Sequence, residues 1–343
     1  MSNERLKKLC LVLSTVLLMV WTAGCTKGVD SEAGTKEFVN VSYDPTRELF
    51  AAYNKAFKDV WKEVSKEDVA FQHLHGGSGK QARQVIDGLE ADVVTLALAA
   101  DVDEIQAAGL IEKGWINEFP NNSAPYTSTI VFLVRKGNPK DITDWDDLIR
   151  DDVSIVTPNP KTSGGARWNY LAAWEYARQK YDGDEQQIRA FIKKLFENVV
   201  ALDSGARGST NSFVKDGKGD VLLAWENEAL LVLKDLPDEY ELVTPSLSIL
   251  AEPSVAVVDA VVDRKGTRRI AEEYIRYLYS PEGQEIVATN FYRPRNSSIL
   301  AKYSKVFKPL TLVTIDDAFG GWTKAQREHF ADGAIFDQIF KAR

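Results

Sequence analysis

The sequence predicts an α/β protein built of two lobes, and three observations support this fold class. From residue 38 onward, short apolar strands alternate with amphipathic helices. The opening runs strand, helix, strand, helix, strand, which is the pattern of a doubly wound layer. The length of 343 residues suits about two domains.

Each expected element has a local signal. Residues 45–64 place their apolar side chains on one helical face, and residues 69–75 alternate as a half-buried strand does. The continuous apolar run 92–99 is typical of a buried strand in a parallel sheet. The expected order is strand 38–43, helix 45–64, strand 69–75, helix 79–89, strand 92–99, strand 128–139, helix 141–148, strand 153–158, a helix over 167–181, segments 187–196, 198–203, 221–233 and 240–245 that continue the alternation, a strand at 249–265, and finally 266–290.

The element count also suggests where the lobes divide. We expect residues 38–120 and 252–310 to form one lobe and residues 121–251 to form the other, so the chain crosses near 120 and near 250. We expect residues 311–343 to pack across both lobes.

The first residues predict export. Residues 1–24 resemble a signal peptide, because a basic start precedes the apolar run 9–21, which is too short to span a membrane comfortably. The "TAGC" that ends in Cys25 resembles the lipobox of bacterial lipoproteins, although Thr22 stands where an aliphatic residue is usual. Lipidation of Cys25 would leave residues 25–37 as a flexible tether to the periplasmic or outer cell surface, whereas plain secretion is the alternative.

Charge and cysteine content exclude several function classes. The net charge of −8 makes nucleic acid an unexpected partner. Cys10 would leave with the signal peptide, so the mature chain would keep Cys25 alone and could form neither an internal disulfide nor a cysteine metal site. We expect a monomer without a cofactor and without a further membrane span.

Four stretches share a strand end, a loop of small residues and the start of a helix: 42–47, 75–81, 162–167 and 203–210. A helix N-terminus leaves its first N–H groups unpaired and carries roughly half a positive charge. Small residues let an anion approach those N–H groups closely. Because open sheets bind ligands at the carboxyl ends of their strands, the four loops predict an anion site.

Each loop also has a purely structural interpretation. Asp44 followed by Pro45 makes a good helix start, and Ser78 and Ser163 could simply cap helices. The anion site and the cap therefore remain alternative explanations for these positions.

Gly164 and Gly165 are harder to explain by structure alone. Each glycine in a helix costs about 1 kcal/mol against alanine. Close approach of a ligand to the backbone would explain both. Trp225 is more often a core residue than a ligand contact at such a position, but its indole N–H donates and cannot accept, which suits an ionised oxyanion.

Two catalytic or phosphate motifs fail in the second loop. The sequence "GGSGKQ" does not fit the GxxxxGK[ST] phosphate loop, because Leu74 and Gln81 stand at required positions. It does not fit the GxSxG nucleophile elbow either, because Lys80 replaces the last glycine.

A metal site is also not expected. His73 and His75 lie two apart on a predicted strand and so could point to one face. Only His329 remains beyond them, so the donors for a zinc site are missing.

At the four loops and at Trp225 the sequence resembles the periplasmic sulfate- and thiosulfate-binding proteins of bacterial ABC transporters. The resemblance runs from Phe38 to the C-terminus. It rests on "VSYDPTRELF", "HGGSGKQARQVIDGLEADVVTLAL", "KTSGGARWNYLAAW", "DSGARGST", "GDVLLAWENEA", "FYRPRN" and "ADGAIFDQIF".

The resemblance implies a class II periplasmic binding-protein fold, in which each lobe has a mixed, mostly parallel sheet flanked by helices. It implies that the two lobes close on one sulfate in the cleft between them, which uncharged donors hold. It implies an ABC permease as the partner. The implied donors are the backbone N–H groups of Asp44, Ser78, Gly164, Gly165 and Ala206, the hydroxyl of Ser163 and the indole of Trp225.

Physical chemistry agrees with that donor set. Sulfate at neutral pH has no proton to offer, so every contact must be a donor. A protonated phosphate would leave its hydrogen unpaired at a cost of about 1–3 kcal/mol. A thiosulfate or other tetrahedral oxyanion receptor remains an alternative, as do an exported serine hydrolase using Ser78 or Ser163 and an adhesin or scaffold lipoprotein.

Overall fold

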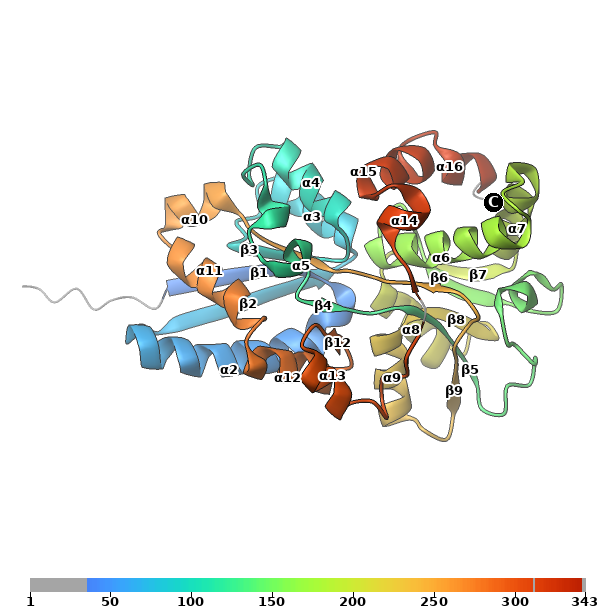
Figure 1. Ribbon diagram of the computed structural model, residues 1–343, viewed down its shortest axis with the longest axis horizontal. Coiled ribbons are helices and arrows are strands. Elements are labelled where there is room, and N and C mark those ends of the chain that lie inside the picture. Colours follow the sequence, from blue (N-terminus) through green and yellow to red (C-terminus); the bar gives the residue numbers. More distant parts are fainter. Residues whose placement is uncertain (1–35, 311, 341–343) are drawn as a thin grey trace, which may run out of the picture. The chain divides into compact units, whose positions relative to one another are not determined.

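The computed structural model describes residues 36–310 and 312–340 (Figure 1). The predicted signal peptide 1–24 and Cys25 lie outside the described residues, so cleavage and lipidation stay predictions. Among the helices that are described, none has the length and apolar character needed to cross a membrane.

The first sheet has four strands in the order β11-β3-β1-β2. β1 (Lys36–Tyr43) pairs in parallel with β3 (Val93–Leu96), as the continuous apolar run predicted. β11 (Ser254–Val257) runs antiparallel to β3, and β2 (Val69–Gly76) forms the other edge. The helices grouped with this sheet are α2 (Arg47–Ser65), α3 (Ser78–Ile86), α4 (Ala99–Ala107), α10 (Asp259–Lys265) and α11 (Arg268–Tyr277) (Figure 1).

The second sheet has five strands in the order β7-β6-β8-β5-β9. β6 (Ile155–Pro158) lies parallel to both β7 (Val199–Asp203) and β8 (Val221–Trp225). β5 (Ile130–Arg135) runs antiparallel to β8 and to β9 (Tyr240–Val243). The helical elements grouped with this sheet are η3 (Trp145–Ile149), α6 (Gly164–Lys180), α7 (Glu185–Glu197), α8 (Ala206–Val214) and α9 (Glu226–Asp235) (Figure 1).

We call the first sheet with its helices the first lobe and the second sheet with its helices the second lobe. Strands of the first sheet come from both before β5 and after β9, and the predicted α/β architecture is confirmed. The bounds predicted for the lobes, 38–120 with 252–310 and 121–251, stay a prediction.

Short pairings join the segments that run between the two sheets. Ser128 and Ala251 form an antiparallel bridge whose two N–H···O distances are 2.9 and 3.0 Å. β4 (Tyr126–Thr127) pairs with β12 (Arg293–Pro294). A further pair is β10 (Ser248–Ile249) with β13 (Leu312–Val313).

The remaining elements are short. They are η1 (Asp44–Thr46), η2 (Trp115–Asn117), α5 (Pro120–Ser123), α12 (Pro281–Thr289), α13 (Ser297–Lys302), α14 (Ile315–Phe319), α15 (Trp322–Ala325), the π-helix η4 (Gln326–Phe330) and α16 (Ile335–Ile339). α15 contacts α4 of the first lobe, and α16 contacts α7 of the second. The ring of Trp322 meets that of Trp168 on α6 edge-on, with 4.6 Å between ring centroids.

The strand expected over 249–265 is only partly correct, because β11 covers four residues and α10 follows it. The valine-rich sequence favours a strand, but burial of Val261 and Val262 on one helical face overrides that preference. Gly266, with φ of 66°, then ends α10 in the left-handed conformation.

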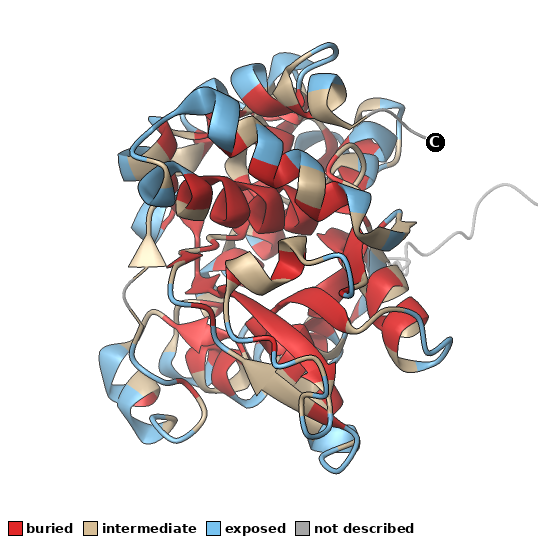
Figure 2. Cartoon of the chain, turned by 90° about the vertical axis from the view of Figure 1, so that its right-hand side faces the viewer, coloured by how far each residue is buried: buried red, intermediate tan, exposed pale blue. Residues whose placement is uncertain are grey.

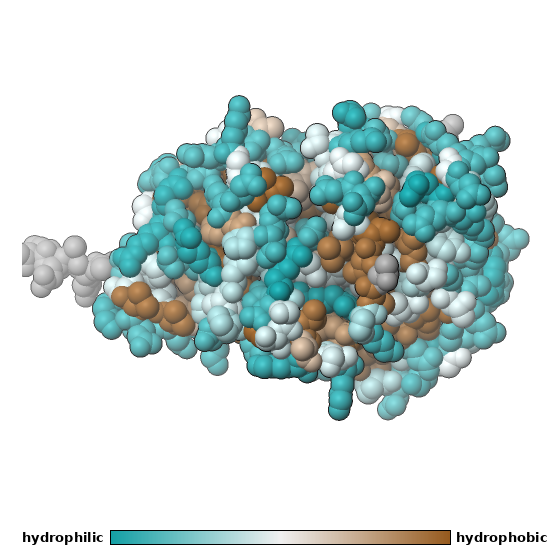
Figure 3. Space-filling view, viewed as in Figure 1, coloured by the Kyte–Doolittle hydropathy of each residue, from teal (hydrophilic) through white to brown (hydrophobic). Residues whose placement is uncertain are grey.

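The core reaches into both lobes, and α6 is its most buried helix, with every residue from Gly164 to Glu175 buried (Figure 2). On the face shown in Figure 3 the surface is mostly hydrophilic, and its apolar residues lie in separate groups. The N-terminus of α6 therefore begins inside the protein rather than at its surface.

Candidate functional site

The buried start of α6 is the centre of the candidate site. Ser163 is the N-cap residue, and its Oγ accepts from the N–H of Ala166 at 3.4 Å. Gly164 and Gly165 are the first two residues of the helix. Their N–H groups point out of the helix start, because the first turn has no preceding carbonyl to bond.

Both glycines allow close packing. A Cβ atom on Gly164 would lie 2.8 Å from the Cβ of Ala97 and 3.0 Å from the Cβ of Ser78, both in the first lobe. A Cβ on Gly165 would lie 3.2 Å from Nε1 of Trp225. The structure therefore gives the two glycines a steric reason: α6 begins in direct contact with the start of α3 and with Trp225.

The starts of α8 and η1 meet at a second close contact. Gly205, the N-cap residue of α8, precedes Ala206 and has no side chain to cap the helix. A Cβ on Gly205 would overlap Oδ2 of Asp44 and would lie 3.4 Å from the backbone nitrogen of Gly77. The loops of Asp44, Ser78 and Ala206 thus come together, although they lie far apart in the sequence.

Gly77 is a site residue that the sequence did not identify. A Cβ there would lie 2.5 Å from the carbonyl oxygen of Thr162 and 2.6 Å from that of Ser204, two backbone atoms of the second lobe. The signal was present in the double glycine before Ser78. The facing carbonyls could not be known from the sequence.

The backbone donors implied by the resemblance are unused by the protein. None of the five N–H groups donates a hydrogen bond to another residue within 36–310 or 312–340; they belong to Asp44, Ser78, Gly164, Gly165 and Ala206. Four of these residues are buried, and Ala206 is half-buried. Buried N–H groups without an acceptor cost free energy, so this concentration of free donors indicates a place for an acceptor ligand.

Arg167 follows directly after the donor loop of α6, but a carboxylate engages it. Its guanidinium contacts Oδ1 of Asp101 at 2.8 Å, and both side chains are almost fully buried. Asp101 also accepts from Oγ of Ser78 at 2.5 Å, while that oxygen accepts from the N–H of Ala97 at 2.9 Å. The hydroxyl of Ser78 is therefore occupied, and its backbone N–H alone remains free.

Arg207, next to Ala206, is engaged in the same way. It lies 2.7 Å from Glu48 on α2 and 2.9 Å from Glu228 on α9. Burial raises the pKa of Glu228 despite this cation, whereas at Glu48 the hydrogen bond and charge of Arg207 outweigh the effect of burial and lower the pKa. The charges of Arg167 and Arg207 are thus compensated by carboxylates beside them. The partial positive charge of the helix N-termini remains as the source of positive potential at these loops.

The side chain of Asp44 contacts Arg47 and the neighbouring loop of Gly205. Burial raises its pKa, and Arg47 partly offsets this from 3.5 Å. The carboxyl packs against the Cα of Gly205. Asp44 can therefore offer its N–H at the helix start while its side chain is turned to the neighbouring loop.

Trp225 has an internal partner. Its side chain is buried, and Nε1 donates to the carbonyl oxygen of Gly165 at 3.2 Å. The ring also packs against Tyr43, with 5.3 Å between ring centroids. Trp225 thus lies beside the α6 start, and its indole N–H already donates to a backbone carbonyl.

The histidine pair forms a separate cluster. Nδ1 of His75 lies 2.5 Å from Oγ of Ser42, and Nδ1 of His73 lies 2.9 Å from the amide nitrogen of Asn54. Burial lowers the pKa of His75 to about 3. Among the residues that are described, no group of three histidine, cysteine or carboxylate side chains could hold a metal ion.

The chain is similar to known proteins over most of its length. A family described as "Bacterial extracellular solute-binding protein" matches residues 42–293. The sulfate-binding protein of Escherichia coli (strain K12) is 63% identical over 306 residues, which cover 89% of this chain and 93% of that protein. The thiosulfate-binding protein of Pseudomonas aeruginosa is 48% identical over 320 residues, covering 93% and 96%.

A solved structure agrees with the two-lobed fold. The sulfate-binding protein SubI from Mycobacterium tuberculosis H37Rv superposes with a TM-score of 0.78 at 30% identity, covering 86% of this chain and 99% of that one. The chain therefore belongs to the family of bacterial extracellular solute-binding proteins.

Proposed function

We propose that this protein is an exported sulfate receptor that delivers its ligand to the membrane permease of an ABC transporter. Its relatives named for sulfate and thiosulfate support this proposal, because they cover nearly the whole chain. The close contacts between the loops of the two lobes support a receptor that closes on its ligand.

The observation that carries the proposal is the set of free donors. Five backbone N–H groups from four helix starts have no acceptor among the described residues, and all belong to adjoining loops. We propose that these groups, together with the hydroxyl of Ser163 and the indole of Trp225, bind one sulfate dianion. Ser163 supports this role because its Oγ accepts from the helix and so keeps its own hydrogen for a ligand.

The donor set explains a preference for a fully ionised guest. Neutral N–H groups at helix starts attract an anion without burying an opposite charge and its desolvation cost. The nearby guanidinium groups of Arg167 and Arg207 already contact carboxylates. The proposed donors themselves offer no acceptor to a guest that carries a proton, so we expect discrimination against phosphate.

Thiosulfate is the second candidate ligand. The relative named for thiosulfate is 48% identical, and the same donors suit its three oxygens. The two ligands differ in one atom, so their relative affinities decide between these candidates.

A binding role fits the serines better than catalysis does. The hydroxyl of Ser78 donates to a carboxylate, and that of Ser163 accepts from a backbone N–H. A nucleophilic serine needs a general base within hydrogen-bond reach. No histidine among the described residues is a partner of either hydroxyl, so we propose a receptor rather than a hydrolase.

We further propose that Cys25 is lipidated and anchors a monomer to the membrane through residues 26–37. The proposed lobes are 38–120 with 252–310, and 121–251, with residues 311–343 across them. Contacts of α15 with α4 and of α16 with α7 support the last assignment.

Isothermal titration of the mature chain with sulfate, thiosulfate, phosphate and molybdate tests the ligand assignment. We expect saturable, one-to-one binding of sulfate and a weaker response to phosphate. Tight phosphate binding with no sulfate response would refute the proposal. A higher affinity for thiosulfate than for sulfate would select the second candidate.

A further inference from the structure

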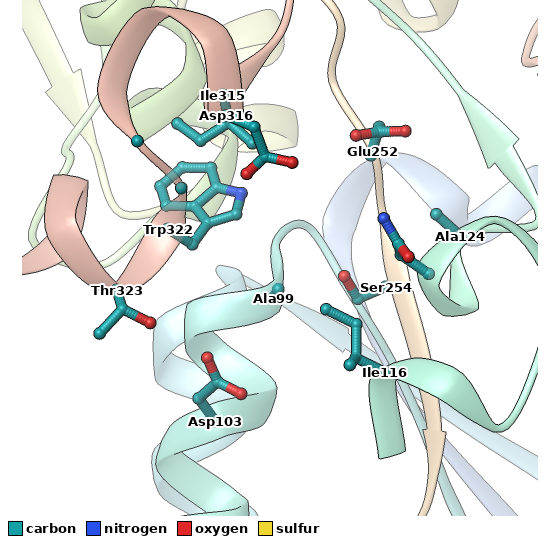
Figure 4. Close-up of a pocket in the computed structure, with 13 residues that line it drawn as sticks. Ala99, Asp103, Ile116, Ala124, Glu252, Ser254, Ile315, Asp316, Trp322 and Thr323 are labelled. Atoms are coloured by element: carbon teal, nitrogen blue, oxygen red, sulfur yellow. The ribbon is translucent and has the colours of Figure 1, made fainter. Parts of the chain in front are cut away.

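A separate cavity lies between the first lobe and the C-terminal helices. It has a volume of about 240 Å³. Its walls come from α4, η2, α5 and the approach to β11 on one side, and from α14 and α15 on the other. Figure 4 shows Trp322, Asp316, Glu252, Ser254 and Asp103 around this space.

Three carboxylates line the cavity, and they are not equally compensated. Glu252 is neutralised by Arg295 at 2.5 Å. Asp103 accepts from Nε1 of Trp115 at 3.1 Å, and its pKa is raised because it is partly buried. Neither Asp103 nor Asp316 forms an ion pair with a residue of the described chain. Two carboxylates therefore face the cavity without a cation.

Two nearly buried polar groups in the same cavity also lack partners. Ser254 is 3% exposed and Trp322 is 7% exposed. Neither Oγ of Ser254 nor Nε1 of Trp322 has a hydrogen-bond partner among the described residues. Figure 4 shows the indole nitrogen on the side of Asp316 and Glu252, and the hydroxyl of Ser254 directed into the same space. Both residues line the cavity, so these two polar atoms are free to bond a molecule inside it.

We propose that this cavity binds a small primary ammonium compound that also carries an oxygen acceptor, as an amino alcohol does. The ammonium group would contact the carboxylate of Asp316, and Asp103 adds negative charge to the same cavity. Its oxygen would accept from the indole N–H of Trp322, which can only donate. Ser254 can serve either group.

The lining excludes other ligand classes. An anion would be repelled by the uncompensated carboxylates. A metal ion is not expected, because the described residues contain no group of three ligands that could hold one. A purely apolar molecule would leave Ser254 and Trp322 unpaired, at the cost of a buried polar group each.

The occupant would bridge parts of the chain that belong to different lobes. α15 carries Trp322, which packs on Trp168 of the second lobe, and α4 carries Asp103 of the first. A ligand that touches both favours the arrangement in which α15 lies against α4. The cavity is distinct from the proposed sulfate site, since none of the seven residues assigned to sulfate lines it.

Titration of the mature chain with ethanolamine at neutral pH tests the proposal, because ethanolamine is then an ammonium ion with one hydroxyl. Ethylene glycol is the matched neutral control. The test variants are Asp316→Asn, which removes an exposed charge, and Trp322→Phe, which removes the indole donor. The control variant is Asp238→Asn, which makes the same charge change at an exposed position outside the cavity.

We expect saturable binding of ethanolamine by the parent chain and none of ethylene glycol. Asp316→Asn should weaken the binding about tenfold or more, since one charged hydrogen bond is lost, and Asp238→Asn should leave it unchanged. Three results would each overturn the proposal. They are no saturable response of the parent chain, equal binding of ethylene glycol, and unchanged ethanolamine binding in both test variants.

Discussion

The indole nitrogen of Trp225 lies 3.2 Å from the point that a Cβ atom on Gly165 would occupy, and it donates to the carbonyl oxygen of Gly165 at 3.2 Å. The two residues belong to different elements of the second lobe, α6 and β8. Any side chain at Gly165 would therefore enter the narrow space between the α6 start and the indole.

Gly165→Val should abolish sulfate binding while the fold remains. The branched side chain would push against Trp225 and cover the free N–H groups of the helix start. Gly165 has no positive φ, so the helix can accept a larger residue there without backbone strain. Isothermal titration should show an affinity loss of at least about a hundredfold, or ~3 kcal/mol.

Gln179→Val is the control, because it places the same residue on the exposed end of the same helix. It should bind sulfate as the parent does. Parent-like affinity in Gly165→Val would remove this helix start from the site.

Gly77→Ala should weaken binding although Gly77 is not one of the proposed donors. The added methyl group would lie 2.5 Å from the carbonyl oxygen of Thr162 and 2.6 Å from that of Ser204, which are backbone atoms and cannot rotate away. The backbone of Gly77, at φ −57° and ψ 131°, suits alanine equally well. The strain therefore falls on the contact between the lobes, and we expect at least a tenfold affinity loss by titration.

Gly76→Ala is a close control for this substitution. Its Cβ would meet only the side chain of Gln81, at 3.2 Å, and no backbone atom of the second lobe. Equal affinities of the two alanine variants would show that the contact at Gly77 plays no part in binding.

The sequence predicted the elements and the loops better than their contacts. The apolar run 92–99 correctly predicted a strand that pairs in parallel with β1. A strand that is buried on both faces carries apolar residues at consecutive positions, and this pattern can be read from the sequence. The loops of small residues at 162–167 and 203–210 correctly predicted the starts of two helices. Both features are local, and local patterns are what a single sequence records.

Contacts between distant segments could not be predicted in this way. Nothing in the sequence indicates that Arg167 meets Asp101 or that Gly77 faces two carbonyl groups, because such contacts depend on how the lobes come together. The helix α10 was missed because its valines favour a strand until tertiary packing decides otherwise. The internal hydrogen bond of Trp225 is likewise a product of packing.

Ser163→Ala should lower both sulfate affinity and stability, each by a modest amount. The hydroxyl would be lost as a donor to a charged ligand, which costs about 1.5–3 kcal/mol of binding free energy. The cap on α6 would also be lost, at about 1 kcal/mol of unfolding free energy. Titration and urea unfolding measure the two effects separately. A stability loss with unchanged affinity would assign Ser163 to capping alone.

Acid should destabilise the fold through His329. Burial first, and then the positive charge of Arg189, lower the pKa of His329 to about 4. Its ring lies among Tyr170, Trp174 and Phe319, with its Nδ1 3.2 Å from the hydroxyl of Tyr170. The imidazole is therefore neutral in the folded chain at pH values where an exposed histidine already binds a proton.

The sign of the pH effect follows from this difference in protonation. Above about pH 6.5 neither the folded nor the unfolded state carries the proton, and the contribution to stability is complete. Between pH 6.5 and 4 the unfolded state binds the proton more readily, so the free energy of unfolding falls by on the order of 3 kcal/mol. Urea unfolding at pH 7.5 and pH 4.5 measures that loss.

His329→Phe keeps an aromatic ring in the cluster and cannot titrate, so its unfolding free energy should fall less between the two pH values. An equal fall in variant and parent would assign the acid sensitivity to other groups, such as the half-buried His75, whose pKa burial also lowers.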